Sequence, residues 1–363
     1  MHPVRVDVRA GTGGYTVLFG DGLSSRLGSL LDERHLGARR FVVSNPVVWR
    51  LHGERIGRAV PGAEVIQVPD GERHKHLHTV ARIYEGLTRA EADRGCVVVA
   101  VGGGVIGDMA GFAAATYLRG VGLVHVPTTL LAQVDASIGG KVGVNLPAGK
   151  NLVGAFYPPL LVVSDPSMLQ TLPRREYRAG LYEIIKYGMA CSADLFGRLQ
   201  GDAGRLAVPD SEVIAPFIVA CCAIKARIVS DDEREAGPRR VLNFGHSVGH
   251  ALESVTAYRR FRHGEAVAWG MVVASRIAVA RGLLREEDGR ALEALVMRLG
   301  PLPQVADLSA PPILAAMRRD KKVLDGRLHF VLPSGIGSAT IVDDVSPSEL
   351  TAALAQVGLG GRH

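Results

Sequence analysis

The first half of the chain alternates short runs of β-branched and apolar residues with stretches whose apolar residues recur at helical spacing. The apolar runs occupy residues 39–45, 64–69, 95–104, 122–129 and 160–166. Runs of this length without polar alternation are typical of strands buried on both faces of a parallel sheet. The sequence therefore predicts an α/β domain with a mostly parallel, Rossmann-like sheet over residues 1–170.

The pattern changes from Thr171 onward. Residues 175–190, 211–230 and 265–282 have apolar residues at helical period, and residues 327–342 favour one extended hairpin. A chain of 363 residues favours two domains, and the proline-containing turn before residue 174 marks the break. We therefore predict a mainly α-helical second domain over residues 171–363, which binds metal and substrate.

Composition limits the location and the partners. The N-terminal residues carry charges and glycines where a secretory signal needs an apolar segment, and no run reaches about 18 uncharged apolar residues. The four cysteines Cys96, Cys191, Cys221 and Cys222 lack metal-ligand spacing, which favours reduced thiols. The net charge of +6 comes from scattered Lys and Arg with 5% aromatic residues, so a small anionic ligand explains it as well as nucleic acid does. We expect a soluble cytoplasmic protein that binds neither nucleic acid nor membrane.

A glycine-rich turn follows the third apolar run. In VAVGGGVIGDMAGFAA, Gly102, Gly104 and Gly107 fit the G-x-G-x-x-G spacing, which lets the main chain approach a phosphate at a helix N-terminus. The acidic residue expected about 20 positions later for a ribose hydroxyl is missing. The turn predicts a dinucleotide site of unusual layout, and a packing turn without a ligand stays open as the alternative.

A second glycine-rich segment, DASIGGKVGVNLPAGKN, follows the run that ends in Thr128 and Thr129. It is predicted to be a loop that carries Asp135, Lys141, Lys150 and Asn151. Lysines on glycine-rich backbone suit a ligand with several phosphate or carboxylate groups. Each lysine taken alone is more often a solvated surface charge.

The stretch LNFGHSVGH places His246 and His250 four residues apart on a predicted helix, but Ser247 stands where a zinc protease carries its general base. A hydrolase is therefore disfavoured, and the spacing alone favours these two histidines as a metal-binding pair or as hydrogen-bonded structural groups. The triplet HKHLH, from His74 to His78, has no carboxylates beside it, so a second metal site there is disfavoured.

Further candidate ligands lie on neighbouring helical segments. Glu183 and Lys186 are three residues apart on one helix face, where an ordinary ion pair is the alternative, and His263 and Glu265 begin another apolar helix. Three protein ligands with an open position and N/O donors suit catalytic Zn²⁺ or a similar ion.

Long segments together resemble the 3-dehydroquinate synthases of the sugar phosphate cyclase family. The matching residues are 71–75, 102–120, 127–159, 172–188, 232–253, 263–271 and 320–323. They cover most of the chain in family order. The resemblance implies a dehydroquinate synthase-like fold, with NAD and one divalent metal, Zn²⁺ or Co²⁺, in a cleft between the domains.

The resemblance also assigns residues. It implies Glu183, His246 and His263 as metal ligands, so that His250 faces the substrate instead of the metal. The implied NAD contacts are Asp70, Gly71, Glu72, Lys75, Gly103, Gly104, Val105, Gly107, Asp108, Thr128, Thr129, Asp135, Lys141, Lys150 and Thr171. Glu72 would replace the missing ribose acid. Asn45 stands where relatives often carry an acid, and its amide can still hydrogen-bond the adenosine part.

The substrate contacts implied by the resemblance fall into three groups. Those near the phosphate are Lys141, Asn151, Asn243, His250 and either Lys321 or Lys322. Arg119 would reach the substrate from the neighbouring subunit of a homodimer. Those around the ring hydroxyls and the carboxylate are Lys186, Lys225 and Arg239.

The implied reaction turns 3-deoxy-D-arabino-heptulosonate 7-phosphate into 3-dehydroquinate and phosphate by transient oxidation, phosphate elimination, re-reduction and aldol closure. Such chemistry needs a Lewis acid and no metal-activated water, which agrees with Ser247 in place of a glutamate. A sister cyclase of secondary metabolism, a metal-dependent polyol dehydrogenase and a non-catalytic NAD-binding protein are the alternatives.

Overall fold

The computed structural model describes residues 3–9, 11, 13–235, 237–318, 323–324 and 327–359. Contacts divide the chain into two units. Unit 1 comprises Met1–Pro173 and Pro209–Arg234, and unit 2 comprises Arg174–Val208 and Glu235–His363. One boundary after residue 170 was predicted from the sequence. The first contact boundary lies close to it, but the chain then returns to unit 1 for one helix, α7 (Ser211–Asp231).

A seven-stranded sheet forms the centre of unit 1, in the order β1-β2-β9-β6-β5-β3-β4. The strands are β1 (Val4–Val8), β2 (Tyr15–Phe19), β3 (Arg40–Ser44), β4 (Glu64–Gln67), β5 (Val97–Gly102), β6 (Gly122–Pro127) and β9 (Leu161–Ser164). All neighbours pair in parallel except β1 and β2. The five predicted strands and the mostly parallel sheet are thus confirmed. Strands β1 and β2 were not predicted, and in β1 the exposed Arg5 and Asp7 interrupt the apolar pattern.

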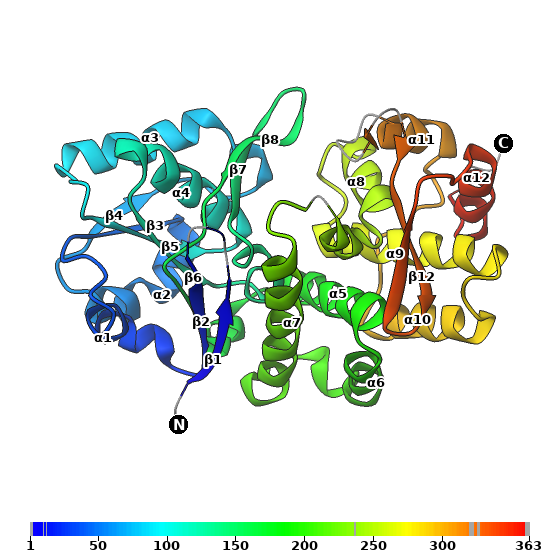
Figure 1. The fold of residues 1–363 in the computed structure, drawn as a ribbon, viewed down its shortest axis with the longest axis horizontal. Coiled ribbons are helices and arrows are strands. Elements are labelled where there is room, and N and C mark those ends of the chain that lie inside the picture. Colours follow the sequence, from blue (N-terminus) through cyan, green and yellow to red (C-terminus); the bar gives the residue numbers. More distant parts are fainter. Residues whose placement is uncertain are drawn as a thin grey trace. The chain divides into compact units, whose positions relative to one another are not determined.

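Helices cover both faces of this sheet (Figure 1). One apolar core joins α3 (Leu77–Arg89) and α4 (Gly104–Thr116) to one face. A second core joins α1 (Leu27–Asp32) and α2 (Pro46–Ala59) to the other. Successive residues of β5 face opposite cores, and all six are buried, which explains its unbroken apolar run.

The predicted second glycine-rich loop is wrong in part, because most of it is a hairpin of β7 (Lys141–Leu146) and β8 (Gly149–Phe156). Val142 and Val144 are buried against α4 at every second position, a strand period that the glycines obscure. Gly143 is required for the pairing, since a Cβ atom there would lie 2.5 Å from the Val153 carbonyl oxygen.

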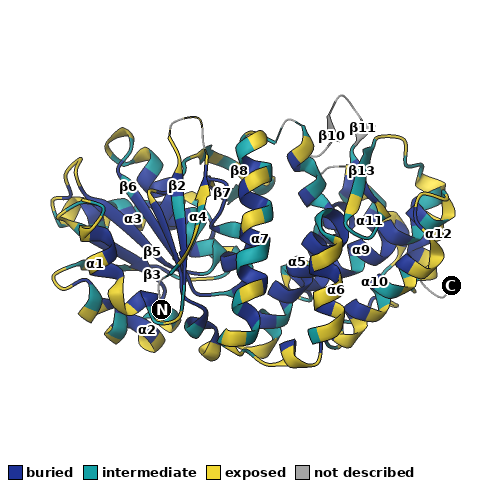
Figure 2. Ribbon diagram, turned by 60° about the horizontal axis from the view of Figure 1, so that its bottom comes forward, coloured by how far each residue is buried: buried dark blue, intermediate teal, exposed yellow. Residues whose placement is uncertain are grey.

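Helix α7 is long and apolar enough, by length and composition, to span a membrane. It nevertheless packs within unit 1, against β1 and against the short helical segments Ala132–Ala136 and Pro166–Thr171. Its buried residues include Phe217, Ile218 and Cys222, while its other face is exposed (Figure 2). These contacts identify α7 as a core helix of unit 1.

Unit 2 is mainly helical, as predicted. Its helices are α5 (Arg174–Cys191), α6 (Ala193–Asp202), α8 (His246–Val255), α9 (His263–Ala280), α10 (Glu286–Arg298), α11 (Ala310–Arg318) and α12 (Pro347–Gln356). Helix α9 is its centre, because it contacts α5, α8, α10 and α12. The predicted hairpin is confirmed as β12 (Phe330–Gly335) and β13 (Ser338–Val342), and two-residue strands β10 (Val323–Leu324) and β11 (Arg327–Leu328) precede it.

Candidate active site

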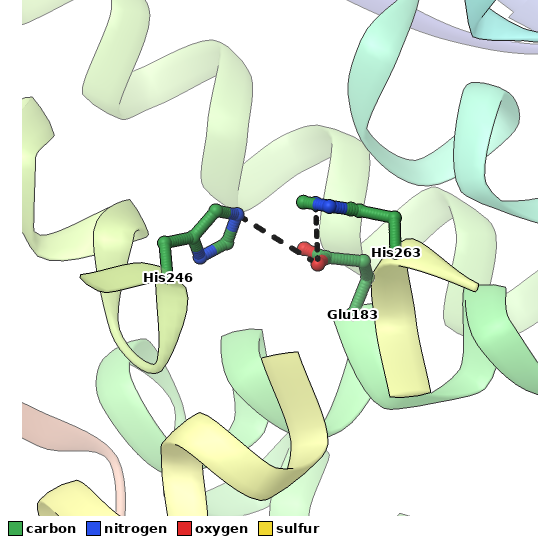
Figure 3. Close-up of side chains that lie close together, drawn as sticks. All are labelled: Glu183, His246 and His263. Carbon is green, nitrogen blue, oxygen red and sulfur yellow. Dashed lines mark ion pairs between the residues drawn. The ribbon is translucent and has the colours of Figure 1, made fainter. Parts of the chain in front are cut away.

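Three helices of unit 2 bring Glu183, His246 and His263 together (Figure 3). Glu183 lies in the middle of α5, and the two histidines are the first residues of α8 and α9. The Glu183 Oε1 atom is 3.9 Å from Nε2 of His246 and 3.7 Å from Nε2 of His263. Donor atoms bound at about 2.0–2.1 Å to a tetrahedral ion lie about 3.3–3.4 Å apart, so a small contraction would close this set around a cation.

The outer nitrogens of both imidazoles face acceptors. Nδ1 of His246 lies 3.1 Å from the Phe244 carbonyl oxygen, and Nδ1 of His263 lies 3.3 Å from Oε2 of Glu253. A proton on each Nδ1 satisfies these acceptors and leaves a lone pair on each Nε2. The lone pairs of the two Nε2 atoms therefore point at Oε1 of Glu183, so that three electron-rich atoms face one another.

The Glu183 side chain is fully buried, and neither of its oxygens accepts a hydrogen bond from the described part of the chain. The Lys186 ammonium is nevertheless 2.6 Å from Oε2, too close for anything but a direct ion pair, so we treat Oε2 as neutralised. Oε1 then faces only the imidazoles among the described residues, and an unpaired buried carboxylate oxygen is costly. A cation between Oε1 and the two Nε2 atoms would remove this cost. The residues fit a divalent metal.

Other unit 2 candidates lie on α8 and on the segment before it. The His250 ring centroid is 5.5 Å from that of His246 and 5.9 Å from that of His263. Asn243 donates to Glu235 in the segment before α8, and Arg239 is buried in the short helical segment Pro238–Asn243. Lys321 and Lys322, predicted near the phosphate, lie outside the described residues.

Glu265, considered from the sequence as a companion of His263, has a structural role instead. Its carboxylate accepts two hydrogen bonds of 2.7 Å from Arg175 and one from the Arg262 amide, in a capping box at the start of α9. These contacts fix the helix end that carries His263.

In unit 1 the glycine turn connects β5 to α4, as predicted. Gly103 caps α4 without a side-chain hydrogen bond, and the first helical bond runs from the Gly107 amide to the Gly103 carbonyl. Amides of the first turn thus have no partner within the helix and can bind an anion. Gly102 serves packing, because a Cβ atom there would lie 2.6 Å from Ile106.

Several predicted cofactor residues meet beside this turn. The buried Lys75 ammonium pairs with Asp108 and donates to Oδ1 of Asn151 at 2.5 Å. Burial alone would lower the pKa of Lys75, but the carboxylates of Asp108 and Glu72 raise it, so the ammonium stays charged. Lys150 lies 3.7 Å from the carboxylate of Glu72, which also accepts a hydrogen bond from Asn145.

The remaining unit 1 candidates have protein partners or lie at the surface. Lys225 on α7 donates to the side chain and the carbonyl of Asp135, both at 2.7 Å. Asn45 caps α2 and donates to Asp70 at 2.9 Å, and Thr171 hydrogen-bonds His52 at 2.9 Å. Arg119 and Lys141 are exposed. Thr128 directly follows β6, and Gly71 precedes the short helical segment Glu72–His74. Gly104 and Val105 begin α4, and Thr129 lies next to Gly103.

Two residues beside the candidate sites were not selected from the sequence. Glu253 lies three residues after His250 and seven after His246, a spacing that places all three on one face of α8. His125, on β6, lines a cavity of about 10 Å³ under the glycine turn, and burial lowers its pKa to about 4. Helical spacing could have revealed Glu253, whereas nothing in the apolar strand marks His125.

The triplet from His74 to His78 forms no group of potential metal ligands among the described residues, and His76 instead caps α3. All four cysteines are free thiols, and three of them are buried.

Comparisons with known proteins cover most of the chain. Residues 65–179 match the family model described as 3-dehydroquinate synthase N-terminal, and residues 180–323 match that described as 3-dehydroquinate synthase C-terminal. A 3-dehydroquinate synthase of Gloeobacter violaceus is 48% identical over 339 residues, which cover 92% of this chain and 94% of that protein.

Two solved structures are similar to the whole chain. One is the 2-epi-5-epi-valiolone synthase of Streptomyces hygroscopicus subsp. jinggangensis 5008 with NAD⁺ and Zn²⁺ bound, at 31% identity and a TM-score of 0.88, covering 98% of this chain and 99% of that one. The other is a 2-deoxy-scyllo-inosose synthase complexed with carbaglucose-6-phosphate, NAD⁺ and Co²⁺, at 28% identity and a TM-score of 0.85, covering 98% of this chain and 100% of that one.

Proposed function

The chain belongs to the 3-dehydroquinate synthase family of shikimate-pathway enzymes, and we propose that it converts 3-deoxy-D-arabino-heptulosonate 7-phosphate to 3-dehydroquinate with NAD and one divalent cation. The chain is an enzyme with 3-dehydroquinate synthase activity. The support for this activity is its similarity to relatives such as the 3-dehydroquinate synthase of Gloeobacter violaceus. The observation that carries the cation requirement is the convergence of Oε1 of Glu183 with two imidazole Nε2 atoms.

Glu183, His246 and His263 hold the cation in this proposal. A divalent cation, when bound, stabilises negative charge on substrate oxygens as a Lewis acid. Lys186 neutralises the second Glu183 oxygen, and this leaves Oε1 for the metal. His250, on the same helix as His246, is within reach of a substrate bound there. Zn²⁺ and Co²⁺ both suit such an N/O donor set, and relatives bind one or the other.

Unit 1 holds NAD in this proposal, through the glycine turn and the charged groups beside it. NAD, when bound, accepts a hydride and returns it, so that one molecule serves repeated turnovers. The proposed contacts are Asn45, Asp70, Gly71, Glu72, Lys75, Gly103, Gly104, Val105, Gly107, Asp108, Thr128, Thr129, Asp135, Lys141, Lys150 and Thr171. The uncapped amides of α4 support the assignment, because they suit a pyrophosphate.

For the substrate, we assign Lys141, Asn151, Asn243 and His250 to the phosphate side, and Arg239 and Lys186 to the carboxylate and the hydroxyls. Lys225 contributes less than Arg239, because its ammonium is bound by Asp135, whereas a guanidinium has five donors to share among partners. Arg119 acts from the partner subunit of a homodimer, which its exposure permits. A cytoplasmic location agrees with a metabolic enzyme in which the one apolar helix of membrane-spanning length among the described residues packs in unit 1.

An assay with purified protein, Zn²⁺ and NAD tests the proposal. We expect phosphate release from the heptulosonate phosphate without accumulation of NADH. Stoichiometric NADH would identify a polyol dehydrogenase. Faster phosphate release from an uncarboxylated heptulose phosphate would identify a sister cyclase.

A further inference from the structure

We propose that Glu253 is a positioning residue for the metal site, which orients the imidazole of His263 and strengthens it as a ligand. The inference rests on the proposed metal site and concerns a residue that does not itself touch the cation. Its basis is the 3.3 Å contact between Oε2 of Glu253 and Nδ1 of His263.

The contact joins two helices. Glu253 is in the last turns of α8, and His263 is the first residue of α9 after the intervening loop. The Glu253 side chain is buried, whereas that of His263 is 31% exposed. An imidazole that is partly open to solvent at a helix end can rotate about two bonds. A buried carboxylate behind it limits that rotation and keeps Nε2 directed at Glu183.

The contact also sets the protonation of the ring. A carboxylate accepts only, so the proton of a neutral imidazole is held on Nδ1 and the lone pair on Nε2 faces Oε1 of Glu183. His246 receives the same tautomer from a backbone carbonyl, which carries no net charge. The full negative charge of Glu253 makes it the stronger acceptor of the two, and carboxylate–histidine pairs of this kind orient zinc ligands in other proteins.

The charges agree with this arrangement. Glu183 and Glu253 are buried carboxylates that face the two ring nitrogens of His263, and Lys186 pairs with Glu183. A divalent cation next to Glu183 is also attracted by Glu253 through the ring. Each buried carboxylate is therefore less costly when the cation is bound.

A second arrangement is geometrically available, since His250, Glu253 and His263 also form a group of potential ligands. In that group Glu253 would bind the cation directly and would compete with Glu183 for it. A neutral imidazole has one lone pair, so His263 cannot serve both groups at once. The Glu183 set is favoured, because Oε1 of Glu183 faces the two imidazoles and lacks a hydrogen-bond donor among the described residues.

The test is the zinc affinity of the metal-free protein, measured by competition with a chromophoric chelator and without substrate. We expect Glu253→Ala to weaken zinc binding by about 10–100-fold, the range found for such supporting groups. Glu253→Gln should weaken it less, because the amide oxygen can still accept from Nδ1. Glu293→Gln is the matched control, since that partly buried carboxylate pairs with Arg276 on α9 and should leave the affinity unchanged.

Two further measurements keep the outcomes separate. The ¹⁵N shifts of His263 report its tautomer in the metal-free protein, and we expect the Nδ1–H form in the parent and in Glu253→Gln but a mixture in Glu253→Ala. Glu183→Ala tests the metal site itself. If it binds zinc like the parent, the proposed function is wrong, whatever Glu253 does.

Zinc affinities of Glu253→Ala and Glu253→Gln within about twofold of the parent would overturn the inference. Loss of zinc in Glu253→Gln as complete as in Glu183→Ala would also overturn it, because Glu253 would then be a ligand. If Glu253→Ala does not fold, the affinity and tautomer of Glu253→Gln decide the question.

Discussion

The candidate sites of the two units differ in how their charges are compensated. In unit 1 the buried cations among the candidates pair with anions of the same unit, Lys75 with Asp108 and Lys225 with Asp135. In unit 2 the Glu183 oxygen that faces the two imidazoles meets two further acceptors instead of a donor. Unit 1 can therefore hold its site without a ligand, whereas a bound cation would complete the electrostatics of the unit 2 site.

The difference has a thermodynamic consequence. A buried charge without a partner costs free energy, and a ligand that pairs with this charge binds more tightly because it removes that cost. A ligand that enters a network of paired charges must first replace existing contacts. We therefore expect the metal site to depend on its few ligands far more steeply than the dinucleotide site depends on any one of its contacts.

The largest expected effect is on metal binding. Glu183→Ala and His263→Ala should each lose the metal and lower kcat/KM by about 10³-fold or more, since a Lewis acid contributes several kcal/mol to the transition state. Metal content by atomic emission and phosphate release measure the two effects, and NAD affinity should be retained. Stoichiometric zinc in His263→Ala would show that the ligand set is wrong.

The next prediction concerns the paired network of unit 1. Lys75→Met leaves the Asp108 carboxylate without its ammonium and should destabilise unit 1 by about 3 kcal/mol, the lower end for a broken buried pair. The lower end applies because the Asp108 side chain is 23% exposed.

The two tryptophans separate the units, since Trp49 lies in unit 1 and Trp269 in unit 2. Urea unfolding of Trp269→Phe, with and without Lys75→Met, therefore reports on unit 1 through Trp49. The double variant Lys75→Met/Asp108→Asn should recover most of the lost stability. An unchanged unfolding midpoint in Lys75→Met would mean that the pair is not a structural element of unit 1.

The comparison also explains what the sequence could predict. The five predicted strands and the helical second half follow from local periodicity and were predicted correctly, although the edge strand β4 is mostly exposed instead of buried on both faces. The hairpin β7–β8 was missed because its glycines resemble loop residues, although they are needed for close strand pairing. Local spacing detects the elements whose pattern is apolar and regular, and it fails where glycine replaces the apolar residue.

The sites show the same limit. The i, i+4 spacing of His246 and His250 suggested a metal-binding pair. In the group of Glu183, His246 and His263, however, the second histidine is His263, which lies on another helix. Only the family resemblance suggested that set, because the start of α9 is brought to α5 by helix packing. The pairing of Lys225 with Asp135 joins residues 90 positions apart, and no local pattern encodes it.

A smaller effect should appear in the pH dependence of unit 1. Burial lowers the folded-state pKa of His125 from 6.5 to about 4, so between these values the unfolded chain binds more protons. The contribution of His125 to stability is therefore complete above about pH 6.5 and falls by up to about 3 kcal/mol as the pH drops to about 4.

Urea unfolding of the Trp269→Phe protein at several pH values between these limits measures this slope. His125→Gln should flatten it, and the remaining slope includes His52, whose pKa burial also lowers. Equal slopes for the parent and for His125→Gln would show that His125 is hydrated in the folded protein.

The smallest expected effect concerns Arg239 and Lys225, for which the family resemblance implied the same role. Arg239→Ala should raise KM for the carboxylated substrate by about 10–100-fold, the value of one charge-assisted hydrogen-bonding group, with little change in NAD affinity. Lys225→Ala should raise it less, because Asp135 already occupies its ammonium. The guanidinium of Arg239 has five donors and can bind a carboxylate while it keeps other partners. A larger increase in KM for Lys225→Ala than for Arg239→Ala would mean that Lys225 exchanges Asp135 for the substrate. The statement that the cations of unit 1 keep their protein partners would then be wrong for Lys225.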